Sequence, residues 1–500
     1  MPQDDPNHIS TDDTSRRRRA LERALAAATL IAATVVLLLI SDRLTRQAHP
    51  SVYLIAATAA IGFAAGGAYC IALWTLRHAA AGPHILIAVI TLGAAMRAIL
   101  FPSAPILEDD FHRYLWDGAV LAQGRDPYRH APLDVIAQHP ELLQTVRRID
   151  PEVNEHLHNI APVPPGLAAL SPEARRTVRH TNHKHLRTIY PPVAQATFVL
   201  AHWIKPFDIS ALRAVWLAFD IAALLLLIWL LRIVGRSPAW AAVYWCNPLL
   251  IQQTISGSHM DVIVLPFVLA ALGLAARHRF IVAVIPLAVA VAAKIWPILL
   301  LPLILRPLLG PRWRNGFIAA AIFIFLAAAM LWPQFAATQT GRSETGTVAY
   351  TMHWFNNSAI FFTLTGIFLP IVKLLYDPEL SYRAELWARF TLAALVIAWT
   401  LWMSRRAWSE PHALFTRATW VIAALFLFSP TQFPWYYIWL LPLLALCPVW
   451  PLLIYTPLLA LYPLHYHWAP VVWIEHAPVW ICLIACAWTR RNHNRPQPAR

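Results

Sequence analysis

A chain of 500 residues is long enough for about three soluble domains of roughly 150 residues each. Its composition excludes that division, because 58% of the residues are hydrophobic and 13% are charged, against roughly 45–50% and about 25% in ordinary globular proteins. The net charge of +14 could indicate a nucleic-acid-binding protein, but the basic residues stand mostly at the ends of apolar runs. That placement is the positive-inside pattern of membrane proteins. We therefore expect an all-α polytopic membrane protein without a nucleic-acid partner.

The first quarter of the chain predicts a tail, three spans and a long polar loop. Residues 1–23 end in five arginines before an apolar run, so we expect a disordered cytoplasmic tail. Residues 24–101 hold three apolar runs, each near the ~20 residues that a bilayer requires. Three crossings bring residues 102–209 to the outer face, where we expect a loop with juxtamembrane helices.

The remaining chain predicts many further spans. We expect central transmembrane helices at 210–335, a second outer loop and half-helix at 336–385, C-terminal transmembrane helices at 386–489, and a cytoplasmic tail at 490–500. The total is about 13–14 transmembrane helices, some of them short and rich in proline. The apolar segments 190–204 and 359–375 would reverse the inside and outside ends if they crossed. We therefore expect both to be half-helices in the outer leaflet or juxtamembrane helices.

The densest polar cluster follows the third span and contains Glu108, Asp109 and Asp110. Three consecutive carboxylates repel one another, so at least one should be protonated more readily than usual or have a cationic partner. Such a group can act as a general base. If a helix starts near Asp110, then Arg113 and Asp117 lie on its face. The alternative is a structural helix start, in which acidic groups favour the helix dipole and Asp117 pairs with Arg113.

At the far end of the loop, Tyr190 precedes two prolines. Pro191 keeps Tyr190 extended, and Pro192 can occupy the first turn of a helix. The Tyr190 ring and the amide of Gln195 are then aimed at the membrane surface, although a purely structural cap is the alternative.

Few cations stand near the outer face to hold an anion. Lys294 lies between two apolar runs, where an ammonium is costly unless it faces a polar cavity or an anion. Snorkelling to the interface is the alternative. Arg113, Arg187 and Lys184 are the other candidates for holding a phosphate.

Other polar side chains on the outer connections could contact a substrate. His259 and Asp261 could orient an acceptor, bind a phosphate or bond to each other. His353, Trp354 and Asn356 could stack on a sugar and read its hydroxyls, or anchor the chain at the interface. Alternating histidines invite a metal site, but they have no third ligand at a known spacing, so we predict no metal site and no cofactor; a divalent cation is not implied. These histidines are His156, His158, His183 and His185.

Several short motifs follow one another along the chain. They are Asp-Asp-Phe-His-Arg-Tyr-Leu-Trp-Asp-Gly at 109–118, Gly-Arg-Asp-Pro-Tyr at 124–128, Ile-Tyr-Pro-Pro-Val-Ala-Gln at 189–195, Gly-Ser-His-Met-Asp at 257–261, Lys-Ile-Trp-Pro at 294–297, Trp-Phe-Asn at 354–356, and Pro-Trp-Tyr at 434–436. The ordered set resembles GT-C integral-membrane glycosyltransferases. In particular, it resembles the bacterial mannosyltransferase-like group that uses polyprenyl-phosphate sugar donors, similar to glycosyltransferase family eighty-seven. The family pattern usually places one helix before the first outer loop, whereas this chain has three.

The resemblance implies a GT-C-type bundle with a catalytic outer loop whose base is Asp110 or its neighbour Asp109. The cations expected at the donor phosphate are Arg113, Arg187 and Lys294. The side chains expected to contact substrate are Tyr114, Asp117, Tyr190, Gln195, His259, Asp261, His353, Trp354, Asn356 and Trp435.

The expected reaction moves a hexose, mannose above all, from a polyprenyl-phosphate donor to a lipid or cell-envelope glycan acceptor with inversion. It would take place on the periplasmic or extracellular face of a bacterial inner membrane, with both termini in the cytoplasm. The alternative is a secondary transporter or a lipid-linked sugar flippase. That class predicts inverted repeats with charges near mid-bilayer, and the sequence shows no such repeat.

Overall fold

The computed structural model describes residues 11–45, 49–78, 82–310, 312–338, 344–376 and 380–493. These residues are mostly helical and contain no β-strand; the two isolated bridges pair Arg187 with Thr345 and Asn356 with Thr431. The prediction of an all-α polytopic membrane protein is confirmed.

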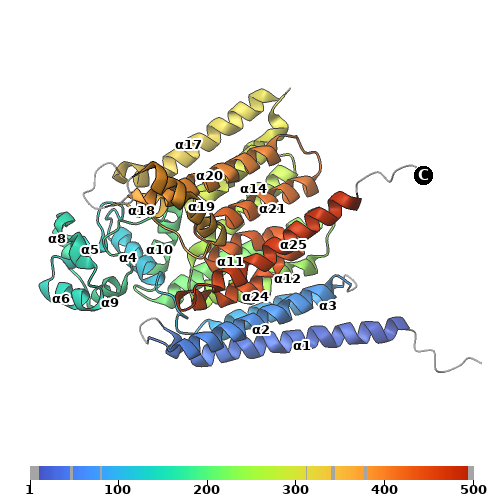
Figure 1. Ribbon diagram of the computed structural model, residues 1–500, viewed down its shortest axis with the longest axis horizontal. Coiled ribbons are helices and arrows are strands. Elements are labelled where there is room, and N and C mark those ends of the chain that lie inside the picture. Colours follow the sequence, from blue (N-terminus) through green and yellow to red (C-terminus); the bar gives the residue numbers. More distant parts are fainter. Residues whose placement is uncertain are drawn as a thin grey trace, which may run out of the picture.

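Three long helices precede the outer loop: α1 (Thr11–Ile40), α2 (Val52–Leu76) and α3 (Pro83–Leu100). They lie along one side of the bundle (Figure 1), and α2 also packs on the later segments Tyr455–Leu458 and Leu459–Tyr466. Gly66 permits this contact, because a Cβ there would lie 2.5 Å from the Cα of Pro457. Residues 11–23, expected to be a disordered tail, are instead helical, since the apolar run and its basic flank continue as one helix; residues 1–10 lie outside the described residues.

The outer loop folds into short helices at one end of the bundle, shown in teal in Figure 1. They are α4 (Phe111–Ala122), α5 (Pro132–Ile136), α6 (Pro140–Ile149), α7 (Val153–His156), α8 (Pro165–Ala168), α9 (Pro172–His180) and α10 (Pro192–Ile204). Proline stands in the first turn of five of them, where its missing N–H costs nothing. We call residues 111–187 the outer cap. Many of its buried apolar side chains, among them Trp116, Leu133 and Val178, form a cluster separate from the bundle core.

The bundle contains the remaining helices. They are α11 (Ile209–Ile233), α12 (Ala242–Trp245), α13 (Pro248–Ile251), α14 (Leu265–Ala276), α15 (Phe280–Ala293), α16 (Leu301–Leu305), α17 (Trp313–Thr338), α18 (Gly346–Met352), α19 (Ala359–Leu375), α20 (Tyr382–Ser404), α21 (Pro411–Phe428), α22 (Leu441–Leu446), α23 (Trp450–Leu453), α24 (Tyr455–Leu458) and α25 (Val471–His493). Figure 1 shows that α1 begins and α25 ends at the end of the bundle opposite to the outer cap.

Eight helices in the described part of the chain are long and apolar enough to cross a membrane. They are α1, α2, α3, α11, α17, α20, α21 and α25, and a bent pair at 248–256 and 260–276 makes a possible ninth. By this measure the expected total of about 13–14 is too high. Prolines divide the other apolar runs into short pieces, as at Trp296–Leu308 and Pro434–Leu446. The half-helix segments are also short: α10 has 13 residues and α19 has 17.

A buried ion pair joins the first three helices to the bundle. Arg97 on α3 lies with its Nε 2.6 Å from Oδ2 of Asp220 on α11, and the hydroxyl of Tyr244 donates to the other carboxylate oxygen at 2.6 Å. Arg97 also donates to the backbone oxygen of Trp245. Charges within a membrane are tolerated when they are paired in this way. We therefore assign this pair to holding the helices together.

Candidate active site

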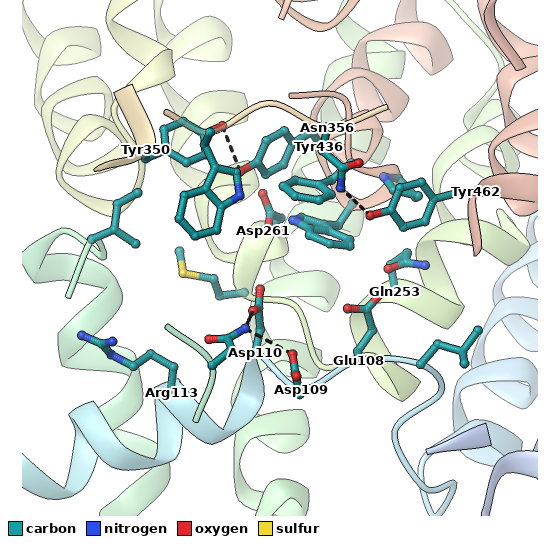
Figure 2. A pocket seen from close by; sticks show the side chains of 18 of the residues that line it. Glu108, Asp109, Asp110, Arg113, Gln253, Asp261, Tyr350, Asn356, Tyr436 and Tyr462 are labelled. Carbon is teal, nitrogen blue, oxygen red and sulfur yellow. Dashed lines mark hydrogen bonds between the residues drawn. The ribbon is translucent and has the colours of Figure 1, made fainter. Parts of the chain in front are cut away.

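A cavity of about 1070 Å³ lies where the outer cap meets the bundle. Its walls come from segments far apart in the sequence, including the loop before α4, residues 182–191, the break before α14, the residue after α15, α18 and the segment before α22. Figure 2 shows Glu108, Asp109 and Asp110 along one side of the cavity, with Asp261 and Tyr436 on the facing side.

The three consecutive carboxylates all line this cavity. The preceding residue, Leu107, has a left-handed φ of 60°, which is a strained conformation often found at functional sites. Asp110 is the residue before the first turn of α4, yet its side chain makes no capping hydrogen bond to the helix. Its carboxylate is therefore directed to the cavity rather than used to start the helix.

Asn182 is a functional candidate that sequence reasoning missed. Its side-chain nitrogen donates to Oδ1 of Asp109 at 3.1 Å and to Oδ1 of Asp110 at 2.7 Å. Asn182 follows α9 and is 72 residues from Asp110 along the chain. No spacing in the sequence indicates this contact, because only the fold of the outer cap creates it.

Arg113, Asp117 and Gln195 form a buried network. Arg113 Nε lies 2.9 Å from Asp117 Oδ1, and Gln195 Nε2 donates to Asp117 Oδ2 at 3.0 Å. Asp117 and Gln195 do not line the cavity, whereas Arg113 does. The structural pairing of Arg113 with Asp117, considered from sequence as the alternative, is thus present, and it braces α4 against α10.

Two of the cations expected to bind phosphate already interact with other groups of the protein. Arg187 lines the cavity, but its guanidinium donates to the backbone oxygens of Tyr128 and Ala337. Burial lowers the pKa of Arg187. Lys184 does not line the cavity and pairs with Asp150 at 3.2 Å.

Lys294 follows the last residue of α15 and faces the cavity. Its ammonium forms an ion pair with Asp261 and lies 4.4 Å from the centre of the Tyr436 ring. The indole of Trp439 donates to the same carboxylate oxygen of Asp261 at 2.7 Å. The side chain next along the chain, Ile295, is 48% exposed and also lines the cavity. An apolar side chain therefore lies next to Lys294 in the cavity lining.

His259 lies behind the carboxylates and is fully buried. Its Nε2 is 3.4 Å from Glu108 Oε2 and its Nδ1 is 3.7 Å from Asp110 Oδ2. Trp435 stacks on the other side of the ring and lines the cavity, whereas His259 does not. His259 thus contacts the acidic side chains rather than the cavity space.

Aromatic rings and amides surround the rest of the cavity. Trp354 and Asn356 line it, and Asn356 donates to the hydroxyl of Tyr462 at 2.8 Å. His353 does not line the cavity. His183 does, and its ring meets Trp354 with centroids 4.3 Å apart. Burial lowers the pKa of His183, against the opposing effect of Asp110 and Asp109, so the ring is neutral near pH 7.

Tyr114 and Tyr190 both line the cavity, with ring centroids 5.0 Å apart. The alternating histidines of the loop come together only in part: His156 and His185 stack with centroids 3.7 Å apart. Within the described residues, no group of three or more His, Cys, Asp or Glu side chains is placed to hold a metal ion.

A multi-pass helical membrane protein with a cavity of carboxylates, amides and stacked rings is suited to chemistry on a sugar. The model for glycosyltransferase family 87 matches residues 188–430. The chain is therefore a multi-pass membrane protein that is similar to glycosyltransferase family 87 over this segment. The matched residues include His259, Asp261, Lys294 and Asn356, while Asp110 lies before them.

Two curated relatives carry the name alpha-(1->6)-mannopyranosyltransferase A. The protein of Mycobacterium tuberculosis is 24% identical over 362 residues, which are 70% of this chain and 63% of the relative. The protein of Corynebacterium glutamicum is 25% identical over 394 residues, which are 72% of this chain and 71% of the relative. The chain thus spans less than two thirds of the length of the first relative. No solved structure matches the chain.

Proposed function

We propose that this protein transfers a hexose, mannose above all, from a polyprenyl-phosphate donor to a lipid or cell-envelope glycan acceptor, with inversion at the anomeric carbon. One observation carries the proposal. The carboxylate of Asp110 lines a large cavity and takes no part in capping its own helix, while the cation Lys294 lines the same cavity.

Asp110 is the proposed catalytic base. The acceptor hydroxyl oxygen forms the new bond to the anomeric carbon, the bond from that carbon to the donor phosphate oxygen breaks, and the phosphate leaves with the electron pair. Asp110 takes the hydroxyl proton. A positioned base of this kind contributes roughly 10²–10⁴-fold to the rate, and holding the two substrates in line contributes more.

Lys294 is the proposed cation for the donor phosphate. The exposed, apolar Ile295 follows it and also lines the cavity, so we propose that the phosphate of a lipid donor binds here while the hydrocarbon chain stays in the bilayer. The pairing with Asp261 fixes the ammonium in place before substrate arrives. Because Arg187 is engaged by backbone oxygens and Arg113 by Asp117, both are proposed to contribute charge rather than direct contacts.

The rings of Trp354 and Tyr436 are proposed to stack on the sugar, the edge of Trp435 to contact it, and the amide of Asn356 to bond its hydroxyls. All four side chains line the cavity, and Figure 2 shows Asn356 and Tyr436 on the side opposite to the acidic cluster. A sugar held there would present its anomeric carbon between Lys294 and Asp110. Asp261, Tyr114 and Tyr190 complete the proposed substrate contacts.

The proposed location of the cavity is the periplasmic or extracellular face of a bacterial inner membrane. The outer cap lies at the end of the bundle opposite to the start of α1 and the end of α25 (Figure 1). The arginines at 16–19 occupy that start, and such clusters favour the cytoplasm. Both termini are accordingly proposed to be cytoplasmic.

The test is to incubate the purified protein with a panel of polyprenyl-phosphate hexoses and octyl α-mannoside as acceptor. Mass analysis should find free polyprenyl phosphate together with a glycosylated octyl mannoside, for the mannose donor above all. Movement of the intact donor across vesicles without a covalent product would overturn the proposal and favour a flippase.

A further inference from the structure

We propose that Asn182 is a positioning residue for the catalytic base, and that presenting its amide is a task of the outer cap. This inference rests on the proposed function only in naming Asp110 as the base. The amide nitrogen of Asn182 donates to one oxygen of Asp109 and to one oxygen of Asp110, so a single group spans both candidate bases.

The amide fits this task chemically. An NH₂ group offers two hydrogens in fixed directions, one for each carboxylate. It holds Oδ1 of Asp110, which leaves Oδ2, the oxygen nearer His259, to meet the acceptor hydroxyl. It also favours the ionised form of both side chains, which would otherwise repel each other as neighbours in the chain.

The segment that carries Asn182 is fixed at several points. The backbone N–H of Thr181 donates to Thr177 of α9, and the backbone oxygen of Lys184 accepts from Leu133 of α5. Lys184 is tied to Asp150 by its ammonium. These contacts connect the segment to three parts of the outer cap, so the fold of the cap sets the position of the amide.

The backbone conformation at His183 also orients the side chain of Asn182. His183, directly after Asn182, has a left-handed φ of 42°, which is uncommon for a residue with a side chain. The turn directs Asn182 to the carboxylates and His183 to Trp354. Past this turn, the backbone N–H of Arg187 donates to the backbone oxygen of Glu344, and the backbone oxygen of Arg187 accepts from the N–H of Gly346. The segment is thus also joined to the beginning of α18.

Several charged or titratable groups share this environment, and any pH effect must be interpreted with them present. They are Glu108, Asp109, His183, His259, Asp261, Arg113 and Lys294. Asn182 is a neutral donor to Asp110. Its removal should change how readily the acidic pair ionises without changing the formal charge of the site.

The first experiment uses Asn182→Leu, which keeps the approximate size but removes the donor. With the mannose donor and octyl α-mannoside, kcat should fall about 10- to 100-fold, the rate equivalent of one hydrogen bond to a charged group. KM for the donor should stay within about twofold, because the amide does not contact the phosphate. Asn182→Ser, which retains one donor, should be intermediate. Asn154→Leu, on the surface of the same cap, is the matched control and should behave as wild type.

The second experiment does not depend on turnover. A water-soluble carbodiimide modifies protonated carboxyl groups, and mass analysis measures its reaction with residues 109 and 110 as pH is varied. In Asn182→Leu the modification should persist to higher pH than in wild type, and adding Asp109→Asn should reduce that shift.

An unchanged modification profile in a folded Asn182→Leu protein overturns the inference, as does a loss of activity that appears only in KM. If the wild type releases no lipid phosphate while the modification profile still shifts, then the proposed function fails and the positioning of the acidic pair stands.

Discussion

His259 and Trp435 lie face to face, with ring centroids 3.8 Å apart and planes inclined by 13°. Phe433 stacks on the other face of Trp435 at 4.3 Å. The three rings form a column, and the ring nitrogens of the imidazole at its end lie near Glu108 and Asp110. The column therefore links Trp435, which lines the cavity, to the acidic cluster.

Trp435→Leu should lower kcat about 3- to 10-fold, the rate equivalent of losing one aromatic pair. The reason is that the imidazole of His259 loses the surface that holds it. Trp435→Phe keeps a stacking face and should remain within about twofold of wild type. Steady-state kinetics with the mannose donor separates the two variants, and equal losses in both would contradict a stacking role.

Asp110→Asn should reduce turnover by roughly 10²–10⁴-fold while the protein stays folded, because an amide cannot take the proton from the hydroxyl of the acceptor sugar. Asp109→Asn is the matched control at the neighbouring carboxylate and should lose less. Release of polyprenyl phosphate measures both, and the thermal midpoint in detergent reports folding. A larger loss in Asp109→Asn would transfer the role of base to that residue.

Lys294→Met should weaken binding of free polyprenyl phosphate, used as a product inhibitor, by about tenfold or more. Lys294→Met also leaves Asp261 without its ion-pair partner, so the thermal midpoint should fall. The double variant Lys294→Met/Asp261→Asn should regain the thermal midpoint of the wild type but should still bind polyprenyl phosphate weakly. Recovery of both would show that the ion pair serves only the fold.

Arg97→Leu should destabilise the protein by about 3–5 kcal/mol, because the carboxylate of Asp220 remains buried without its partner. The double variant Arg97→Leu/Asp220→Leu should lose clearly less. Denaturant or thermal unfolding in detergent gives both values. Equal destabilisation in the single and double variants would mean that the ion pair is not the cause.

The outer cap should lose stability in acid. Burial, helped by the nearby His180, lowers the pKa of His112 to about 3, while its unfolded value is about 6.5. The unfolded chain therefore binds the proton first, so this contribution to stability is complete above pH 6.5 and declines as pH falls. Between pH 7 and 5 the loss should be about 2 kcal/mol. His112→Phe keeps the stacking ring without the titration and should flatten this dependence in thermal unfolding measured across that range.

The sequence was sufficient for the fold class and for the acidic cluster, because both are local signals. Apolar runs and flanking arginines identify membrane helices, and three adjacent carboxylates stand out in any reading. The expected total of about 13–14 spans exceeds the eight long apolar helices of the described residues, because hydrophobicity alone does not show where prolines such as Pro297 and Pro302 divide an apolar run into shorter helices.

The partners of the acidic cluster could not be predicted for a different reason. Asn182 and Lys294 line the cavity, and His259 contacts the acidic cluster from outside the cavity lining. All three come from different parts of the tertiary structure. Lys294 was identified because a charge among apolar residues is conspicuous, whereas Asn182 is an ordinary loop residue. Asp117 and Gln195 lie at conspicuous motif positions, yet the structure places them in a buried brace away from the cavity lining.

Helix α4 belongs to both halves of the molecule. It gives Tyr114 and Leu115 to the core of the bundle, and Trp116 and Val120 to the apolar cluster of the outer cap. The remaining cap helices can therefore differ in sequence and length, provided that the segment after α9 still brings Asn182 to the acidic pair.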